Sequence, residues 1–350
     1  MFIMTMNVLV VATSHKTRGG ITAVVNAHKQ GEQWDRCNCK WIETHIDRSR
    51  LQSVLYLLKA IVSYVVLLPK ASIVHIHLSE PMSALRKLFF FFFANILKKK
   101  ILVHFHAFSP DSTIRGKFSW IYKYMFRHST RVIVLSQKWK KDVYDTFQND
   151  NIEVIYNPCT SKVSTMSYAK EKKILFAGTI NERKGYADLI KAFAMIAAKY
   201  PDWKVVFAGN GEIVKGNELA QKLNIAHQCE FLGWVTDTDK DKVFKQASIF
   251  CLPSYAEGFP MAVLDAWVYG LPVITTPVGG IPDIAIDNEN MLLFSPGDIE
   301  TLSNCIERLI LDKDLYDKIQ RASSCFAKKT FSVNEVNHQI EQLYKNIIKC

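Results

Sequence analysis

The sequence predicts an α/β protein with two tandem domains, each a doubly wound parallel sheet. The chain has 350 residues, which is enough for two domains of ordinary size. Short runs of Val, Ile, Leu and Phe alternate with amphipathic stretches, as in right-handed βαβ units. A polar stretch without periodicity, Asn157–Lys172, separates the two expected domains, residues 1–160 and 170–330.

The expected strands are nearly continuous in apolar residues, which is typical of strands covered on both faces. In the first half they are Asn7–Thr13, a weaker run at Trp41–Ile46, Ile73–Leu78, Ile101–Phe105 and Arg131–Leu135. In the second half they are Lys173–Ala177, Trp203–Ala208, Cys229–Leu232, Ile249–Leu252, Pro272–Thr275 and Met291–Phe294. Helices are expected between these strands. One example is Gly185–Lys199, whose apolar residues recur at helical spacing.

Composition is that of a globular protein, with 49% hydrophobic and 22% charged residues. The net charge of +11 is concentrated in one half of the chain. Residues 1–158 hold 22 Lys and Arg against 10 Asp and Glu, whereas the remainder holds 22 against 23. This asymmetry suggests an anionic partner for the first half, such as a membrane surface or a phosphorylated lipid. A basic but solvated surface is the alternative, and nucleic acid is disfavoured because no recognition motif accompanies the charge.

Eight cysteines occur without any Cys-x-x-Cys pair, which indicates reduced thiols in a cytoplasmic protein. The first residues, MFIMTMNVLVVATS, lack the features of a signal peptide. Two apolar segments are not expected to span a membrane. Residues 51–68 carry Lys59 and end at Pro69, and residues 88–97 are too short.

Residues 84–100 contain five consecutive Phe, flanked by Arg86, Lys87 and Lys98–Lys100. Two interpretations stay open. The segment is either part of the buried core or an interfacial segment that contacts anionic lipid.

The stretch from Ser254 to Gly280 carries the first candidate site. It predicts a strand, a loop and then a helix over 261–269, with Gly270 just beyond its end. The start of such a helix can bind phosphate through its N–H groups. Gly258 would let the backbone approach a ligand, Glu257 could accept hydrogen bonds from sugar hydroxyls, and Asp265 lies one helical turn further on. Taken alone, the loop could equally serve only to start a helix.

Further motifs follow in a fixed order along the chain. They are TRGGITAVV (17–25), HFHAF (104–108), VLS (134–136), ILFAGTINERKGYADLIKAF (174–193), VVFAGNGE (205–212), FLGWV (231–235) and TTPVGGIPDI (275–284). Together with the 254–280 stretch, this series resembles the retaining glycosyltransferases of family four, which have the GT-B fold. The resemblance covers the second half closely and the first half more loosely.

The resemblance implies roles for residues of the second half. The family's carboxylate pair falls on Glu257 and Asp265, with the first expected on the donor sugar and the second on the nucleotide ribose. The second is an Asp here, one methylene shorter than the family's usual Glu. The family's phosphate-binding Lys falls on Lys184. Thr179 stands where the family has an Arg, and Arg183 is a candidate replacement.

The remaining donor contacts are implied in the same way. The loop residues Gly258, Phe259, Pro260 and Met261 are expected beside the donor, and the backbone around Val235 beside the base. In the first half, Gly19 and Gly20 match the family's glycine loop on the diphosphate. The catalytic residues are then His106, Lys184 and Glu257, with no protein nucleophile.

His106 matches the family's His near the anomeric centre, at the carboxyl end of a strand. His75, His77 and His104 are interpreted as satisfied core or strand-end histidines. No metal or other cofactor is expected. The DTDKDK run (237–242) is interpreted as a helix start with capping Asp residues and not as a metal site.

These expectations define a retaining glycosyltransferase that moves a sugar from a nucleotide-diphosphate donor to a hydroxyl acceptor, a lipid-linked or cell-surface polysaccharide intermediate. The first domain would bind the acceptor and the second the donor, in a crevice between them. The last helix, 333–349, would pack back on the first domain. The protein would be cytoplasmic, at the inner membrane face. Two alternatives remain open: a nucleotide-sugar epimerase of GT-B-like fold, and a non-catalytic nucleotide-sugar-binding subunit.

Overall fold

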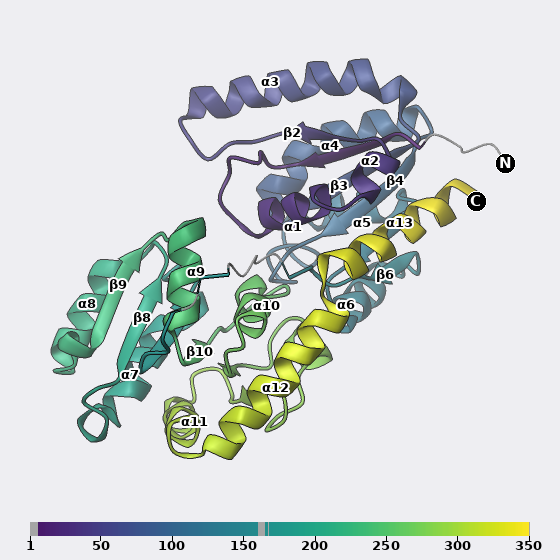
Figure 1. The fold of residues 1–350 in the computed structure, drawn as a ribbon. Coiled ribbons are helices and arrows are strands. Elements are labelled where there is room, and N and C mark those ends of the chain that lie inside the picture. Colours follow the sequence, from purple (N-terminus) through teal and green to yellow (C-terminus); the bar gives the residue numbers. More distant parts are fainter. Residues whose placement is uncertain (1–5, 160–164, 167, 350) are drawn as a thin grey trace. The chain divides into compact units, whose positions relative to one another are not determined.

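The computed structural model describes residues 6–159, 165–166 and 168–349. The chain divides into two compact units, residues 1–160 with 331–350 and residues 161–330 (Figure 1). Each unit contains one six-stranded sheet in which every strand pair is parallel. The predicted α/β class with two doubly wound sheets is confirmed. Within the predicted linker, residues 160–164 and 167 lie outside the described residues, as do residues 1–5 at the start of the chain.

The first sheet has the order β2-β1-β3-β4-β5-β6. Its strands are β1 (Val8–Ala12), β2 (Cys39–Glu43), β3 (Ile73–Leu78), β4 (Lys100–Phe105), β5 (Arg131–Val134) and β6 (Ile152–Val154). Its helices are α1 (Gly20–Lys29), α2 (Gln33–Arg36), α3 (Arg50–Leu67), α4 (Pro81–Ile96), α5 (Ser119–Arg127), α6 (Gln137–Phe147) and α13 (Val333–Lys349), with the 3₁₀ turn η1 (Leu68–Lys70).

Helices cover both faces of this first sheet. On one face α3, α4, α5 and α6 build a core around residues such as Phe90, Phe105 and Trp139. On the other face α1, α2 and α13 build a second core, in which Tyr344 and Ile347 of α13 are buried. The last helix therefore belongs to the first unit. Its ends coincide with those expected from the sequence.

The second sheet has the order β12-β11-β10-β7-β8-β9. Its strands are β7 (Lys173–Ala177), β8 (Lys204–Ala208), β9 (Cys229–Gly233), β10 (Ile249–Leu252), β11 (Val273–Thr275) and β12 (Leu292–Leu293). Its helices are α7 (Tyr186–Ala194), α8 (Ile213–Lys222), α9 (Asp237–Gln246), α10 (Met261–Val268), α11 (Ile299–Leu311) and α12 (Lys313–Thr330), with the 3₁₀ turns η2 (Glu182–Lys184), η3 (Ala197–Lys199), η4 (Ala226–Gln228) and η5 (Ile281–Asp283).

Strand order fixes where each unit can bind a ligand. In doubly wound sheets ligands bind at the carboxyl ends of the strands, where the winding direction reverses. In the first unit this point lies between β1 and β3, and in the second between β7 and β10. The loops that follow β7 and β10 contain Lys184 and Glu257.

The larger differences from the expected elements occur at the sheet edges and at one helix, whereas several inner strands and α10 differ by a single residue at an end. The strand expected at Trp41–Ile46 is observed two to three residues earlier, as Cys39–Glu43, and the three-residue strand β6 was not expected. The helix expected over Gly185–Lys199 ends at Ala194, and η3 follows it. Edge strands bury one side less completely, so their apolar signal is weaker.

Candidate active site

Lys184 and Glu257 meet at the carboxyl ends of β7 and β10. The Lys184 ammonium donates to Glu257 Oε1 at 2.5 Å. The hydroxyl of Ser254 donates to the same oxygen at 2.6 Å. The Glu257 side chain is only 8% exposed, so the carboxylate is held in a mostly desolvated place by a cation and a hydroxyl. Buried carboxylates require such partners.

The loop after β7 is shaped by glycines that bring backbones into contact. Gly185 has φ +70°, and a Cβ there would lie 2.0 Å from the Pro253 carbonyl oxygen. Gly178 lies beneath the Lys184 side chain, since a Cβ on Gly178 would be 3.7 Å from Lys184 Cε. The Asn181 side chain caps η2 by accepting from the Lys184 N–H at 3.1 Å. These contacts set the direction of the Lys184 amine.

The loop after β10 is braced by its neighbours. The Tyr255 N–H donates to the Arg183 carbonyl at 2.8 Å, and the Gly280 N–H donates to the Gly258 carbonyl at 2.8 Å. The Thr276 hydroxyl donates to the Ser254 carbonyl at 2.5 Å. The loop that carries Glu257 is therefore tied both to the loop after β7 and to the one after β11.

Replacing Gly279 by alanine should displace the Glu257 loop. Gly279 has φ +61°, and its Cβ would lie 2.1 Å from the Glu257 carbonyl oxygen. We expect the Gly279→Ala variant to unfold several degrees lower, because it combines the left-handed backbone penalty with a backbone clash. Gly233→Ala is the matched control, since Gly233 has φ +68° but its nearest atom would be at an ordinary 3.6 Å. Equal melting temperatures for the two variants would contradict this account of the loop.

Arg183 supplies a second cation beside Glu257. Its Nη1 donates to the Ala256 carbonyl at 2.5 Å and lies 3.7 Å from Glu257 Oε2. Thr179, at the position where a second cation was expected, is exposed and uncharged. Arg183 and Lys184 thus place two positive side chains around one carboxylate, although Thr179 is not basic.

Asp265 lies on α10, whose N-cap residue is Pro260. Phe259 and Asp265 are buried, and Met261 is half-buried as the first helical residue. The Lys240 ammonium of α9 donates to Asp265 Oδ2 at 2.7 Å. Asp265 is therefore balanced by a cation on a different helix, and Glu257, in its loop, is likewise balanced by the Lys184 cation.

The predicted capping of α9 by Asp residues is wrong. The N-cap residue is Thr236, and its side chain makes no capping hydrogen bond within the described structure. Asp241 instead pairs with Lys245 at 3.1 Å and accepts from the Tyr269 hydroxyl at 3.1 Å. The acidic run does start a helix, but Asp241 serves to join α9 to the segment after α10.

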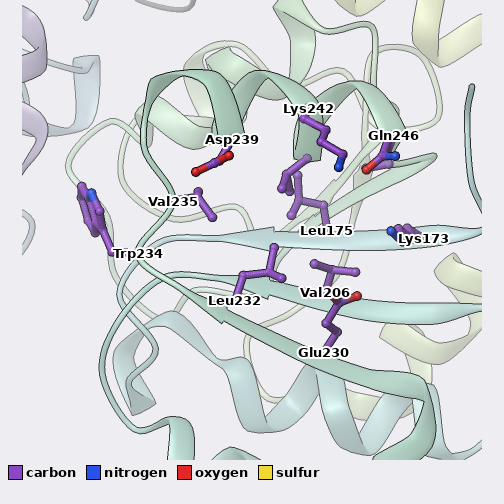
Figure 2. A pocket seen from close by; sticks show the side chains of 12 residues that line it. Lys173, Leu175, Val206, Glu230, Leu232, Trp234, Val235, Asp239, Lys242 and Gln246 are labelled. Carbon is purple, nitrogen blue, oxygen red and sulfur yellow. The ribbon is translucent and has the colours of Figure 1, made fainter. Parts of the chain in front are cut away.

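A pocket of about 440 Å³ lies between α9 and the strands β7, β8 and β9 (Figure 2). Figure 2 shows Trp234 at one side of the pocket and Lys173 at the opposite side. Val235 lines this pocket, but Lys184, Glu257 and Asp265 do not. The geometry of the ion pairs, and not this pocket, defines the candidate active site.

In the first unit Gly19 and Gly20 follow β1, and Gly20 is the first residue of α1. Gly19 is the N-cap residue of α1 and has φ +138°, a conformation that L side chains rarely adopt. Both glycines are exposed, and an added Cβ would meet no atom of the described part of the chain within 4 Å. The backbone at the start of α1 is therefore open to a ligand at the β1–β3 switch point.

His106 follows β4 and belongs to a cluster of five histidines. The others are His28 on α1, His75 and His77 on β3, and His104 on β4. The His77 Nδ1 and the His106 Nε2 lie 2.9 Å apart, and the rings of His104 and His106 stack at 4.1 Å. Burial, followed by the charges of His28 and Lys87, lowers the pKa of His106 to about 3. His106 is therefore neutral at pH 7 and can act there through a hydrogen bond but not through a positive charge.

The interpretation of the other strand histidines as satisfied holds only in part. His75 Nδ1 lies 2.6 Å from the Tyr344 hydroxyl oxygen, and His77 Nδ1 lies 2.9 Å from His106 Nε2. His75, His77 and His104 are buried as expected. Among the residues that the structure describes, the Nε2 atoms of His75 and His77 and both ring nitrogens of His104 have no hydrogen-bond partner. Burial, with the neighbouring histidines adding to it, lowers the pKa of all three well below the ordinary value. Their ring nitrogens lie within 4.8 Å of one another, a spacing at which these neutral imidazoles could hold a metal ion.

Sequence reasoning missed three residues that shape the site. They are Ser254 and Thr276, which fix the Glu257 loop, and Lys240, which holds Asp265. Ser254 follows β10 by two residues, so its place at a strand end could have marked it. Lys240 gave no local signal, because its contact with Asp265 depends on how α9 and α10 pack.

The fold and the site define a class of protein. Two family models cover most of the chain, Glycosyltransferase Family 4 over residues 40–160 and Glycosyl transferases group 1 over residues 160–324. The described fold is the GT-B fold. The chain belongs to the group 1 glycosyltransferases.

Individual relatives and solved structures share 30% or less of their aligned residues with this chain. The chain is 30% identical over 189 residues to an uncharacterized glycosyltransferase of Haemophilus influenzae. The aligned region covers 53% of each chain. A sucrose-phosphate synthase of Thermosynechococcus elongatus has a TM-score of 0.80 at 17% identity, covering 98% of this chain and 99% of that chain. Anabaena Alr3699/HepE, solved with UDP and glucose, has a TM-score of 0.76 at 16% identity, covering 97% and 99%. The chain spans 53% to 64% of the length of the first curated relatives that it matches.

Proposed function

We propose that this protein is a retaining glycosyltransferase that takes a sugar from a nucleotide-diphosphate donor. The observation that carries the proposal is the Lys184–Glu257 pair at the β7–β10 switch point. Cleavage of a sugar–diphosphate bond leaves negative charge on the departing phosphate, which preorganised donors must stabilise. An ammonium has three N–H donors. Lys184 can therefore keep its bond to Glu257 and still donate to a phosphate oxygen.

The candidate-site side chains of the second unit each have a role in this proposed reaction. Lys184 and Arg183 neutralise the diphosphate, and the N–H groups at the start of α10 add their dipole. Glu257, fixed by Ser254, accepts hydrogen bonds from hydroxyls of the donor sugar. Asp265 accepts from the ribose while Lys240 balances its charge. The backbone at Val235 lies beside the base.

The first unit completes the proposed reaction. The backbone at Gly19 and Gly20 meets the diphosphate, and neutral His106 hydrogen-bonds near the anomeric carbon. The acceptor hydroxyl oxygen attacks the anomeric carbon from the face that the diphosphate leaves. The bond from this carbon to the diphosphate breaks, and the hydroxyl proton passes to the departing diphosphate oxygen. The configuration is therefore retained and the protein supplies no nucleophile. The leaving-group charge is neutralised by these side chains and backbone N–H groups, so the proposal assigns no metal ion or other cofactor.

The acceptor is proposed to be a lipid-linked or cell-surface glycan intermediate at the cytoplasmic membrane face. The concentration of positive charge in residues 1–158 supports an anionic surface as the partner. The seven described cysteines are free thiols, which fits a reducing compartment.

Incubation of the protein with UDP-, GDP- and ADP-sugars tests the proposal. UDP-glucose is the first donor to try, because the structurally similar Anabaena protein was solved with UDP and glucose. We expect one donor to raise the melting temperature and to release its nucleoside diphosphate when a lipid-linked acceptor is added, with a chelator making no difference. A changed sugar on an intact nucleotide would identify an epimerase, and binding without turnover a non-catalytic subunit. Either result would overturn the proposal.

A further inference from the structure

Helix α3 exposes an apolar face to the outside of the first unit. Only Ala60 and Tyr64 of its 18 residues are buried. Seven of its aliphatic side chains are at least 50% exposed, and we call them the α3 apolar face. They are Leu51, Val54, Leu55, Leu58, Val62, Val65 and Val66.

These seven side chains lie along one side of the helix. At 3.6 residues per turn they fall within an arc of roughly 120°. Ala60 and Tyr64 project from the opposite side into the core, where the Tyr64 hydroxyl donates to the Phe90 carbonyl at 2.5 Å. A helix on the surface of a water-soluble domain turns its apolar stripe inward. In α3 these seven exposed apolar side chains point outward instead. Figure 1 shows α3 itself on the outer side of the first unit's sheet.

Topology excludes a membrane span for this helix. Among the described residues, Arg50–Lys70 is the one helix that is long and apolar enough to cross a bilayer, and only 17% of its most apolar window is buried. However, the strands on either side of α3, β2 and β3, both pair with β1 in one sheet. A crossing helix would put these two strands on opposite sides of the membrane. If α3 contacts a membrane while the sheet stays intact, it therefore lies along the membrane surface and does not cross it.

Neighbouring helices extend this surface. Helices α4 and α5 cover the same face of the sheet as α3. The exposed apolar side chains of the segment from α4 to α5 are Met82, Leu85, Phe92, Phe93, Ile96, Leu97 and Trp120. A groove of about 500 Å³ lies between the two helices, and apolar and aromatic side chains line it. Phe90 and Phe91, in contrast, are fully buried, so the Phe run belongs partly to the core and partly to the surface.

Positive charge accompanies the apolar surface. Residues 48–110 contain nine Lys and Arg and a single acidic residue, Glu80. The exposed cations of this segment are Arg48, Arg50, Lys59, Lys70 and Lys98. Lys87, expected at the lipid surface by one interpretation of the sequence, is fully buried and donates to the Ser83 hydroxyl at 2.9 Å. The outward cations are therefore those beside α3 and at the end of α4.

We propose that α3 lies in the plane of an anionic phospholipid bilayer with its apolar face among the acyl chains. An outward apolar stripe with flanking cations is the pattern of interfacial helices, and Lys59 can extend its amine to the headgroups. Interfacial cations are attracted to anionic lipid over distances limited by the Debye length. This inference rests on the proposed function and specifies how its membrane partner is bound. Membrane binding by α3 does not itself require sugar transfer.

Flotation of the full-length protein with vesicles tests this proposal. We expect binding to phosphatidylcholine vesicles that contain phosphatidylglycerol, and much weaker binding to phosphatidylcholine alone. The double variant Leu58→Glu/Val62→Glu places two carboxylates at the centre of the α3 apolar face. It should lower the partition onto anionic vesicles by about tenfold or more. The matched control is Val214→Glu/Leu311→Glu, whose positions in the second unit are 70% and 68% exposed. It should bind like the unaltered protein.

Three results would overturn the proposal. They are equal binding of both double variants, no binding of the unaltered protein to anionic vesicles, and a dimer that the α3 variant converts to a monomer without any vesicle binding. Donor binding is measured in parallel by thermal shift. Loss of vesicle binding with an unchanged donor shift would separate this surface from the candidate active site.

Discussion

Replacing Lys184 by alanine is expected to slow sugar transfer by at least about a hundredfold. The amine is the cation nearest to Glu257, at 2.5 Å, and in the proposed reaction it neutralises the departing diphosphate. Loss of one preorganised donor to such a charge typically costs this much in rate. The measurement is release of nucleoside diphosphate under acceptor saturation, with kcat and KM determined separately.

A second variant separates catalysis from folding. Removing Lys184 leaves the mostly buried Glu257 carboxylate with one partner fewer, and this alone can destabilise a protein. Lys184→Gln keeps a hydrogen-bond donor near Glu257 but removes the charge. It should retain the fold and still lose kcat. Lys199→Ala, which breaks an exposed pair with Glu307 at 3.3 Å, is the matched control and should keep full activity. Near-normal kcat in Lys184→Gln would refute the assigned role.

The first unit is expected to lose stability as the pH falls from about 6.5 towards 4. Burial lowers the pKa of His28 from 6.5 to about 4, against the opposing hydrogen bond to Asn337. Between these two values the unfolded chain binds a proton that the folded chain does not. The stability contributed by neutral His28 is therefore complete above pH 6.5 and is lost progressively below it. A shift of this size corresponds to about 3 kcal/mol at the acid end.

Calorimetry of the full-length protein over this pH range checks the prediction. The transition of the first unit should move to lower temperature on acidification, more steeply than that of the second unit. His28→Gln should reduce this pH dependence, although it also costs stability near pH 7 by breaking the contact with Asn337 at 2.6 Å. His227→Gln, at an exposed position on η4, serves as the control. A pH-independent transition for the first unit would contradict the neutral, buried histidine cluster.

The sequence predicted the buried strands well because burial on both faces leaves a continuous apolar signal. β3, β7 and β10 have the bounds expected from the sequence. The short edge strand β6 lacks that signal, since its pattern mixes buried and exposed residues. Helix α3 was expected to be apolar and not to span a membrane, although by length and composition it is able to cross one. Its outward orientation could not be predicted, because which side of a uniformly apolar helix faces the core depends on the packing of Ala60 and Tyr64.

The candidate site was predictable as a set of residues but not as a set of contacts. Motif order placed Lys184 and Glu257 at the ends of adjacent strands, and the structure brings them into one ion pair. The partnership of Lys240 with Asp265 joins two helices and has no signature in either segment. The unpartnered nitrogens of His104 likewise arise from the packing of β3 against β4 and α1, which no local pattern records.

A crystal structure with the nucleotide sugar that most raises the melting temperature tests the central claim most directly. The account predicts the diphosphate within hydrogen-bonding distance of Lys184 Nζ, with sugar hydroxyls on Glu257 and the ribose on Asp265. A donor bound elsewhere in the second unit, with the Lys184–Glu257 pair left without contact to it, would contradict the account.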